Sequence, residues 1–121
     1  MDYTAFVAKA TAQDKRNKFE LYDNSFNIIP DEIKLFYIIY NPVDVELNSN
    51  GVGVRLYPVG NLHELQKEYN YIKAQFVFAT CNGDPIFFNN GCVYTCAHGV
   101  HEPQHEKIAD SFIEYLTSLV D

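Results

Sequence analysis

Long apolar segments and targeting signals are the first features that the 121-residue sequence lacks. Its longest apolar run, around Leu35–Tyr40, is far too short to cross a bilayer. The opening residues, MDYTAFVAKA, carry an early acid and lack the basic segment and long apolar core of a secretory signal. Internal repeats and linkers rich in Pro, Ser or Gly are absent as well. We therefore expect a single domain over residues 1–121 that is cytoplasmic and has no contact with membranes.

Positive charge is also scarce. Nine basic against 16 acidic residues give a formal net charge of −7. A protein that binds nucleic acid directly needs a basic surface for the phosphates, so this balance argues against such a partner. The charge permits a basic protein partner, although solubility alone is the simpler explanation for it.

Cysteine is rare, and its three residues are an odd number. A full disulfide framework is therefore not expected, in agreement with a reduced cytosol. Cys92, Cys96 and His98, followed by His101 and His105, are residue types that bind zinc. On a strand, however, Cys92 and Cys96 would lie roughly 13 Å apart, which is too far for two Zn–S bonds of ~2.3 Å. We expect buried cysteines, no metal and no cofactor.

The apolar pattern predicts an α+β fold with a mixed, largely antiparallel sheet, flanked by helices that include a C-terminal one. A loosely amphipathic helix is expected over residues 2–18. A second begins at Pro30 and ends before Pro42, and a third begins at Asn61. Asn50-Gly51 predicts a hairpin between the strand with Val43, Val45 and Leu47 and the strand with Val52, Val54 and Leu56.

The second half of the sequence predicts a three-stranded meander. The strands are QFVFATC, PIFF and CVYTCAH, separated by turns at Asn82-Gly83 and at Asn89-Asn90-Gly91. After HGVHEP the pattern predicts a helix whose apolar face consists of Ile108, Phe112, Tyr115, Leu116 and Leu119. The expected order of elements is ααββαβββα.

Two kinds of catalytic chemistry stay open as alternatives. Cys81 could act as a nucleophile with His98 as its base and Asp84 as the orienting group, although Asp84 is also explained as a turn residue. The acid pairs Asp44/Glu46 and Glu102/Glu106 could serve as acid and base, and solvated surface acids are the simpler interpretation of both. The glycines show neither GxGxxG spacing nor the context of a phosphate loop.

FVFATCNGDPIFFNNGCVYTCAHG and the following EKIADSFIEYLTSL resemble the C-terminal half of the SUKH superfamily, which includes yeast cell-wall assembly regulators and bacterial Syd proteins. The similar features are Ala79–Gly83, the strands at Pro85–Phe88 and Val93–Ala97, and the DSFIEYL segment from Asp110. IPDEIKLFYIIYNPVDVEL is similar to the upstream segment of that family, so the resemblance covers residues 28 to 119.

The resemblance implies a binding module without catalytic residues. Most bacterial members look like immunity proteins, which bind and neutralise a polymorphic toxin, often a nuclease. A regulatory or scaffold adaptor that binds a host protein is the alternative. With a basic toxin domain as partner, the acids that we expect at the interface are Asp44, Glu46, Asp84, Glu102 and Glu106.

Overall fold

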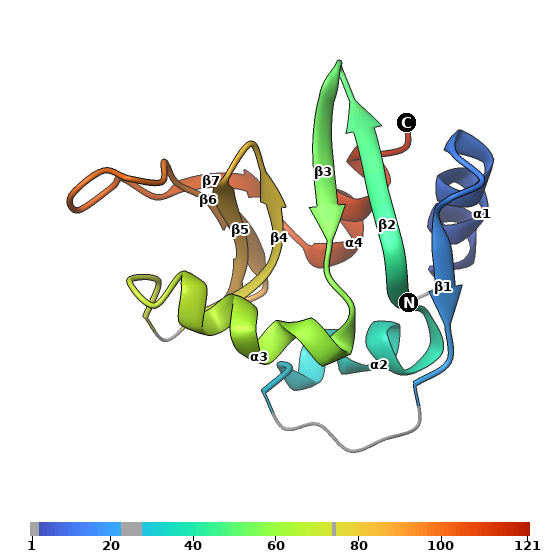
Figure 1. The fold of residues 1–121 in the computed structure, drawn as a ribbon, viewed down its shortest axis with the longest axis horizontal. Coiled ribbons are helices and arrows are strands. Elements are labelled where there is room, and N and C mark those ends of the chain that lie inside the picture. The colour runs from blue at the N-terminus through green and yellow to red at the C-terminus, as the bar shows by residue number, and fades with distance from the viewer. Residues whose placement is uncertain (1–2, 23–27, 74) are drawn as a thin grey trace.

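The computed structural model describes residues 3–22, 28–73 and 75–121 (Figure 1). The elements, in chain order, are α1 (Thr4–Gln13), β1 (Lys18–Glu20), α2 (Asp31–Ile39), β2 (Asn41–Ser49), β3 (Val52–Leu56), α3 (Val59–Glu68), β4 (Phe76–Cys81), β5 (Asp84–Asn89), β6 (Cys92–Thr95), β7 (Glu106–Ala109) and α4 (Phe112–Ser118). None of the helices in these ranges is long and apolar enough to cross a membrane.

The strands of the described residues form one seven-stranded sheet in the order β1-β2-β3-β4-β5-β6-β7, and each neighbouring pair is antiparallel. The predicted α+β class with a C-terminal helix is confirmed. The predicted meander of β4, β5 and β6 is part of a longer one, because the whole sheet follows chain order. The sheet is therefore antiparallel rather than mixed in these residues.

The Asn-Gly turns follow the prediction closely. Both residues have positive φ at Asn50-Gly51 (53° and 80°), at Asn82-Gly83 (52° and 86°) and at Asn90-Gly91 (49° and 84°). This geometry belongs to the two-residue hairpin turns whose twist matches that of the flanking strands, and Asn and Gly tolerate it best.

The last helix begins later than the sequence pattern predicted. Residues 106–109 form β7, which pairs with β6 through Thr95↔Glu106 and Val93↔Ala109. Ile108, expected on the buried helical face, is consequently 38% exposed. The helix begins after Ser111, whose side chain accepts a hydrogen bond from the Glu114 backbone N–H at 3.1 Å. Residue 111 is therefore the N-terminal boundary of α4, because the residues before it pair with the edge of β6 and Ser111 caps the helix.

The first helix is shorter than predicted. It ends at Gln13, and Lys18–Glu20 form a strand that pairs with the start of β2. Asn17 is buried between them, donating to Ala10 O at 2.8 Å and accepting from the Glu46 backbone N–H at 2.9 Å. These two bonds hold Asn17 against α1 and β2, in the short turn that leads from the end of α1 at Gln13 to the start of β1 at Lys18.

Aromatic rings join the helices to one face of the sheet. Phe112 of α4 lies 5.4 Å from Phe36 of α2, 5.1 Å from Phe78 of β4 and 6.1 Å from Tyr3, measured between ring centroids. Figure 1 shows α4 behind the sheet, α1 beside β1, and α3 running across one end of the sheet. These ring contacts bury Phe112, which is 4% exposed, at the point where α2, α4 and β4 meet.

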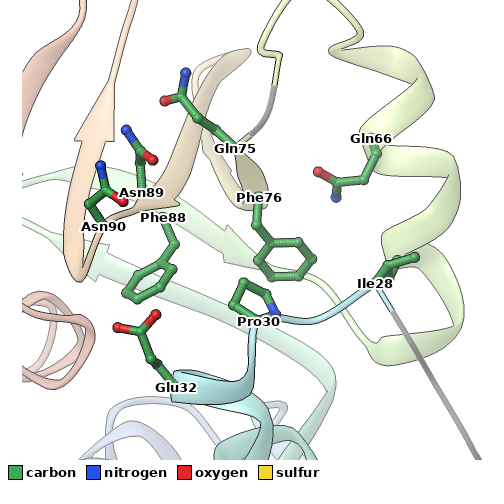
Figure 2. Close-up of a pocket in the computed structure, with 9 residues that line it drawn as sticks. All are labelled: Ile28, Pro30, Glu32, Gln66, Gln75, Phe76, Phe88, Asn89 and Asn90. Carbon is green, nitrogen blue, oxygen red and sulfur yellow. The ribbon is translucent and has the colours of Figure 1, made fainter.

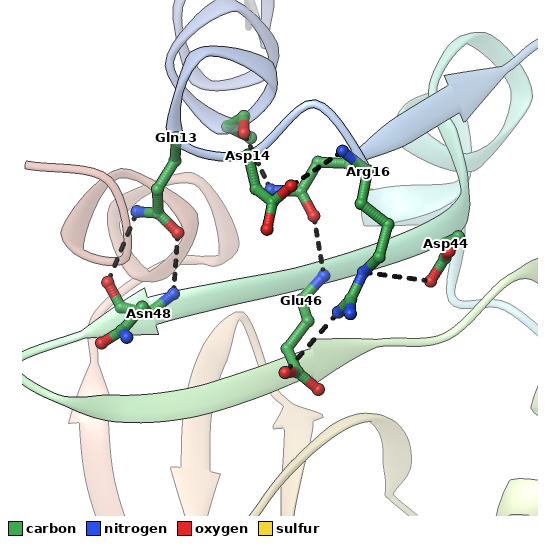
Figure 3. Close-up of polar contacts among 8 residues, drawn as sticks. Gln13, Asp14, Arg16, Asp44, Glu46 and Asn48 are labelled. Carbon is green, nitrogen blue, oxygen red and sulfur yellow. Dashed lines mark hydrogen bonds and ion pairs between the residues drawn. The ribbon is translucent and has the colours of Figure 1, made fainter.

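Amide side chains complete the sheet where neighbouring strands separate. β3 pairs with β4 only from Val54 to Leu56, and the Gln66 side chain of α3 then takes the place of a strand. Gln66 Oε1 accepts from Val77 N at 2.8 Å, and Gln66 Nε2 donates to Val77 O at 2.7 Å. At β2, Gln13 makes the same two kinds of bond with the backbone of Asn48, at 2.7 and 3.4 Å (Figure 3). Backbone groups left unpaired by the strands are therefore satisfied by amides.

Replacing Gln66 by alanine should destabilise the protein by about 1–3 kcal/mol, because the N–H and C=O of the buried Val77 lose their partners. Urea unfolding followed by circular dichroism measures this change. Gln104→Ala is the matched control, since Gln104 is an exposed amide in the loop before β7. Equal stabilities of the two variants would contradict the role assigned to Gln66.

Candidate functional site

Asp44 and Glu46 lie on the polar face of β2, as the alternation predicted, while Val45 and Leu47 are buried on the other face. Figure 3 shows the Arg16 side chain between the two acids. Arg16 Nε is 3.8 Å from Asp44 Oδ1, and Arg16 Nη2 is 3.6 Å from Glu46 Oε2. Part of the negative charge expected on this face is therefore neutralised within the chain.

Asp84, at the start of β5, is bound by His98. Its Oδ1 accepts from the His98 backbone N–H at 2.9 Å and lies 2.7 Å from His98 Nδ1. The side-chain hydrogen bond from His98 is the main reason why the pKa of this carboxyl is lower than its ordinary value. The histidine ring also packs on the turn, because a Cβ placed on Gly83 would lie 3.0 Å from His98 Cε1. The aspartate orients this histidine, as the sequence suggested, and ties the end of β6 to the β4–β5 turn.

Within the described residues, no hydrogen bond or ion pair links the side chain of Glu102 or Glu106 to the other predicted acids. Both are exposed, Glu102 in the loop after β6 with φ of 50° and Glu106 at the start of β7. Neither forms an ion pair with a described residue, so their charge is available to a partner.

The cysteines and the C-terminal histidines are not assembled into a metal site within the described ranges, where no group of three or more His, Cys, Asp or Glu could hold an ion. Burial raises the pKa of the Cys81 and Cys96 thiols above the ordinary value. A raised pKa lowers the thiolate fraction, and the thiolate is the nucleophilic form. His105 packs edge-on against Phe87 with ring centroids 5.0 Å apart.

Sequence reasoning missed the outer face of α2. Ile33, Phe36 and Tyr37 are buried, but Leu35, Ile38 and Ile39 are exposed on the opposite side of the helix. Leu21 extends this apolar surface, because Tyr22 N donates to Ile38 O at 2.9 Å and so holds that segment beside the helix. We call Leu21, Leu35, Ile38 and Ile39 the α2 face. Its signal in the sequence is an apolar run longer than one buried face requires.

A surface pocket of about 390 Å³ lies beside the first turn of α2 (Figure 2). Its walls come from four parts of the chain: the entry to α2, the Gln66 region of α3, the start of β4, and the β5–β6 turn. Glu32 lines the pocket and is three residues before Leu35, so the pocket borders the α2 face. Glu32 also has a local role, because an acid in the first turn of a helix favours the positive N-terminal end.

The charges of the surface are unevenly paired. Six basic side chains lie within 4.0 Å of a carboxylate among the described residues: Lys9, Arg16, Lys18, Lys34, Lys67 and Lys107. Six acids of the same ranges have no ion pair: Asp14, Glu32, Glu68, Glu102, Glu106 and Glu114. Three basic side chains in the described part of the chain have none: Lys15, Arg55 and Lys73. Most of the charge that the surface presents unpaired is therefore negative.

The contact between Gly83 and His98 predicts that Gly83→Ala is more destabilising than Gly51→Ala. Both substitutions place a side chain at positive φ, which costs about 1–2 kcal/mol, but nothing lies within 4 Å of a Cβ at Gly51. Thermal unfolding of the two variants, each repeated with His98→Ala, separates the two effects. The excess cost at Gly83 should disappear when His98 is alanine, and an excess that persists would contradict the contact.

The lowered pKa of Asp84 predicts a stability difference that depends on pH. The folded state favours the carboxylate, so its contribution is present above the unfolded pKa of ~3.9 and is lost as pH falls through the lower folded value. Asp84→Asn should reduce the free energy of unfolding by roughly 0.5–1 kcal/mol at neutral pH, because the contact is partly exposed. Urea titrations between pH 7 and pH 2 should show the difference shrinking at the acidic end, whereas a constant difference would mean that the charge of Asp84 contributes nothing.

Comparison of the chain with protein-family models, curated proteins and solved structures finds no significant match. The family resemblance therefore stays a prediction from the sequence segments that carry it.

Proposed function

We propose that this protein is a non-catalytic binding protein that neutralises a basic protein partner, of the immunity type implied by the resemblance to the SUKH superfamily. The observation that carries the proposal is the α2 face: an exposed apolar surface that borders a pocket containing a carboxylate without an ion pair. The partner on this hypothesis is a toxin domain.

The α2 face has the composition of a contact surface. Leu35 is 55% exposed and Leu21 78%, and the two isoleucines beside them are each more than one-third exposed. Adjacent exposed apolar side chains of this size, with polar residues around them, are typical of protein–protein interaction sites. Burying them under a partner would supply the apolar centre that such interfaces use.

Charge supports a basic partner. The carboxylates without ion pairs give the surface a negative field, which raises the association rate of a positively charged protein. Among the acids predicted from the sequence, Glu102 and Glu106 are more available to such a partner than Asp44, Glu46 and Asp84, which already contact Arg16 or His98. A complex formed in this way should weaken as salt is added.

The proposal is tested by co-expression with a toxin-like domain encoded beside this gene, scoring host survival and co-purification. Rescue of growth that requires this protein, with a complex recovered, supports the immunity function. A stable complex with a host protein and no rescue would replace that function by the adaptor alternative.

Leu35→Ser should weaken the complex about tenfold, because it removes a central apolar contact of the α2 face. Val52→Ser is the matched control, since Val52 is 36% exposed but lies at the start of β3, next to the β2–β3 turn. Titration calorimetry gives both affinities, and thermal unfolding checks that both variants remain folded. Equal affinities of the two variants would remove the α2 face from the proposal.

A further inference from the structure

We propose that the pocket beside Glu32 receives the guanidinium group of an arginine side chain carried by the protein partner. The inference rests on the proposed function for the source of the arginine. The preference of the pocket for that group follows from its own residues.

The floor of the pocket is aromatic. Phe76 and Phe88 are directly opposite each other in the β4–β5 ladder, and each is 5% exposed. Figure 2 shows the Phe76 ring next to Pro30 and the Phe88 ring near Pro30 and Glu32, and all four residues line the pocket. Aromatic rings attract a nearby cation, so the small exposed parts of Phe76 and Phe88 favour a guanidinium group at this wall of the pocket.

Glu32 supplies the negative charge. It belongs to the first turn of α2 and reaches toward the β5–β6 turn, because a Cβ built on Gly91 would lie 3.8 Å from Glu32 Oε2. Its carboxylate has no hydrogen bond and no ion pair with any residue that the structure describes. Two carboxylate oxygens in this position can accept a pair of parallel N–H bonds from one guanidinium.

Amide groups at the rim provide further acceptors. The side chains of Asn89 and Asn90 line the pocket and form no hydrogen bond within the described residues. Gln75 uses only its Nε2 group, which donates to Lys73 O at 3.2 Å, so its carbonyl oxygen is available. Gln66 is different, because both ends of its amide already bind backbone groups. Gln66 therefore forms a fixed wall, and the rim amides and Glu32 form the polar contacts.

These acceptors suit arginine better than lysine. Arginine presents five N–H donors in a plane, which match a carboxylate and several carbonyl oxygens around a flat apolar floor. Lysine presents a compact and strongly hydrated charge that gains little from stacking. A volume of about 390 Å³ is at the small end for ligand pockets and accommodates one side chain.

The position of the pocket fits the binding surface already described. Glu32 and Leu35 are neighbours on α2, so a partner that covers the α2 face would hold its own side chains next to the pocket. An arginine at the edge of that contact would place a desolvated charge pair beside the apolar centre. Such pairs are the kind that fix the orientation of a complex.

The test uses small peptides and the folded protein alone, so it does not depend on the identity of the partner. The probe is acetyl-Gly-Arg-Gly-amide, titrated at millimolar concentration into the isotope-labelled protein and followed by amide chemical shifts in NMR spectra. The matched peptides contain citrulline, which has the shape of arginine without its charge, or lysine. Glu32→Gln is the test variant, and Glu68→Gln is the control, because Glu68 is an exposed acid of α3 without an ion pair in the described residues.

The expected result is a set of shifts confined to the amides of Gln75, Phe76 and residues 88–91, with affinity falling about fivefold in Glu32→Gln and unchanged in Glu68→Gln. The lysine and citrulline peptides should bind at least about threefold more weakly. Shifts spread over the whole surface, equal binding of citrulline or lysine, or no effect of Glu32→Gln would each overturn the inference. If the peptide binds as expected but no toxin is neutralised, the pocket stands and the proposed function fails. If a toxin is neutralised but the peptide does not bind as expected, the pocket is rejected and the proposed function stands.

Discussion

The two hydrogen bonds between the Gln66 side chain and the Val77 backbone hold together the part of the fold where β3 and β4 separate. They allow β3 to leave β4 after Leu56 without exposing unpaired backbone groups, since the amide replaces the missing strand. After β3 leaves β4, α3 crosses the end of the sheet (Figure 1). A pocket lies between Gln66, the start of β4 and the entry to α2. The pocket with Glu32 exists because the sheet is interrupted there and its backbone is still satisfied.

The α2 face and the core residues of α2 lie on opposite sides of the same helix. Phe36 and Tyr37 pack into the aromatic cluster around Phe112, which fixes the rotation of α2 about its axis. That rotation places Leu35 and Ile39 outward and Glu32 over the pocket. Exposing apolar side chains costs solubility, and the excess of unpaired carboxylates offsets part of this cost. The exposed apolar side chains of the α2 face and the unpaired carboxylates are the two surface features on which the proposed binding function rests.

Local sequence signals predicted the features that depend on neighbouring residues. They failed where the structure of a segment depends on residues distant in the sequence. The Asn-Gly turns and the buried positions of α4 follow from short-range chemistry, and both were predicted. Ile108 is spaced from Phe112 as in a helix, yet residues 106–109 are a strand because the edge of β6, more than ten residues earlier, is available for pairing. Arg16 neutralises Asp44 across a distance in sequence that no pattern reveals. The pocket is assembled from residues 28 to 90, so Glu32 showed only its local role in the sequence.

The strict chain order of the sheet also bears on how the molecule is made. Each strand pairs with the strand that precedes it in the chain, so the sheet can grow as the chain emerges. The connections β2–β3, β4–β5 and β5–β6 are two-residue turns that close short loops, whereas the connections before β2 and β4 contain α2 and α3. The aromatic core behaves differently, because Phe112 contacts Tyr3 and Phe36 only after all seven strands of the described chain have been produced. A nascent chain that stops before residue 112 would have a paired sheet over an open apolar face. Such a fragment is a substrate for chaperones and proteases, so only chains that include α4 reach a stable, functional state.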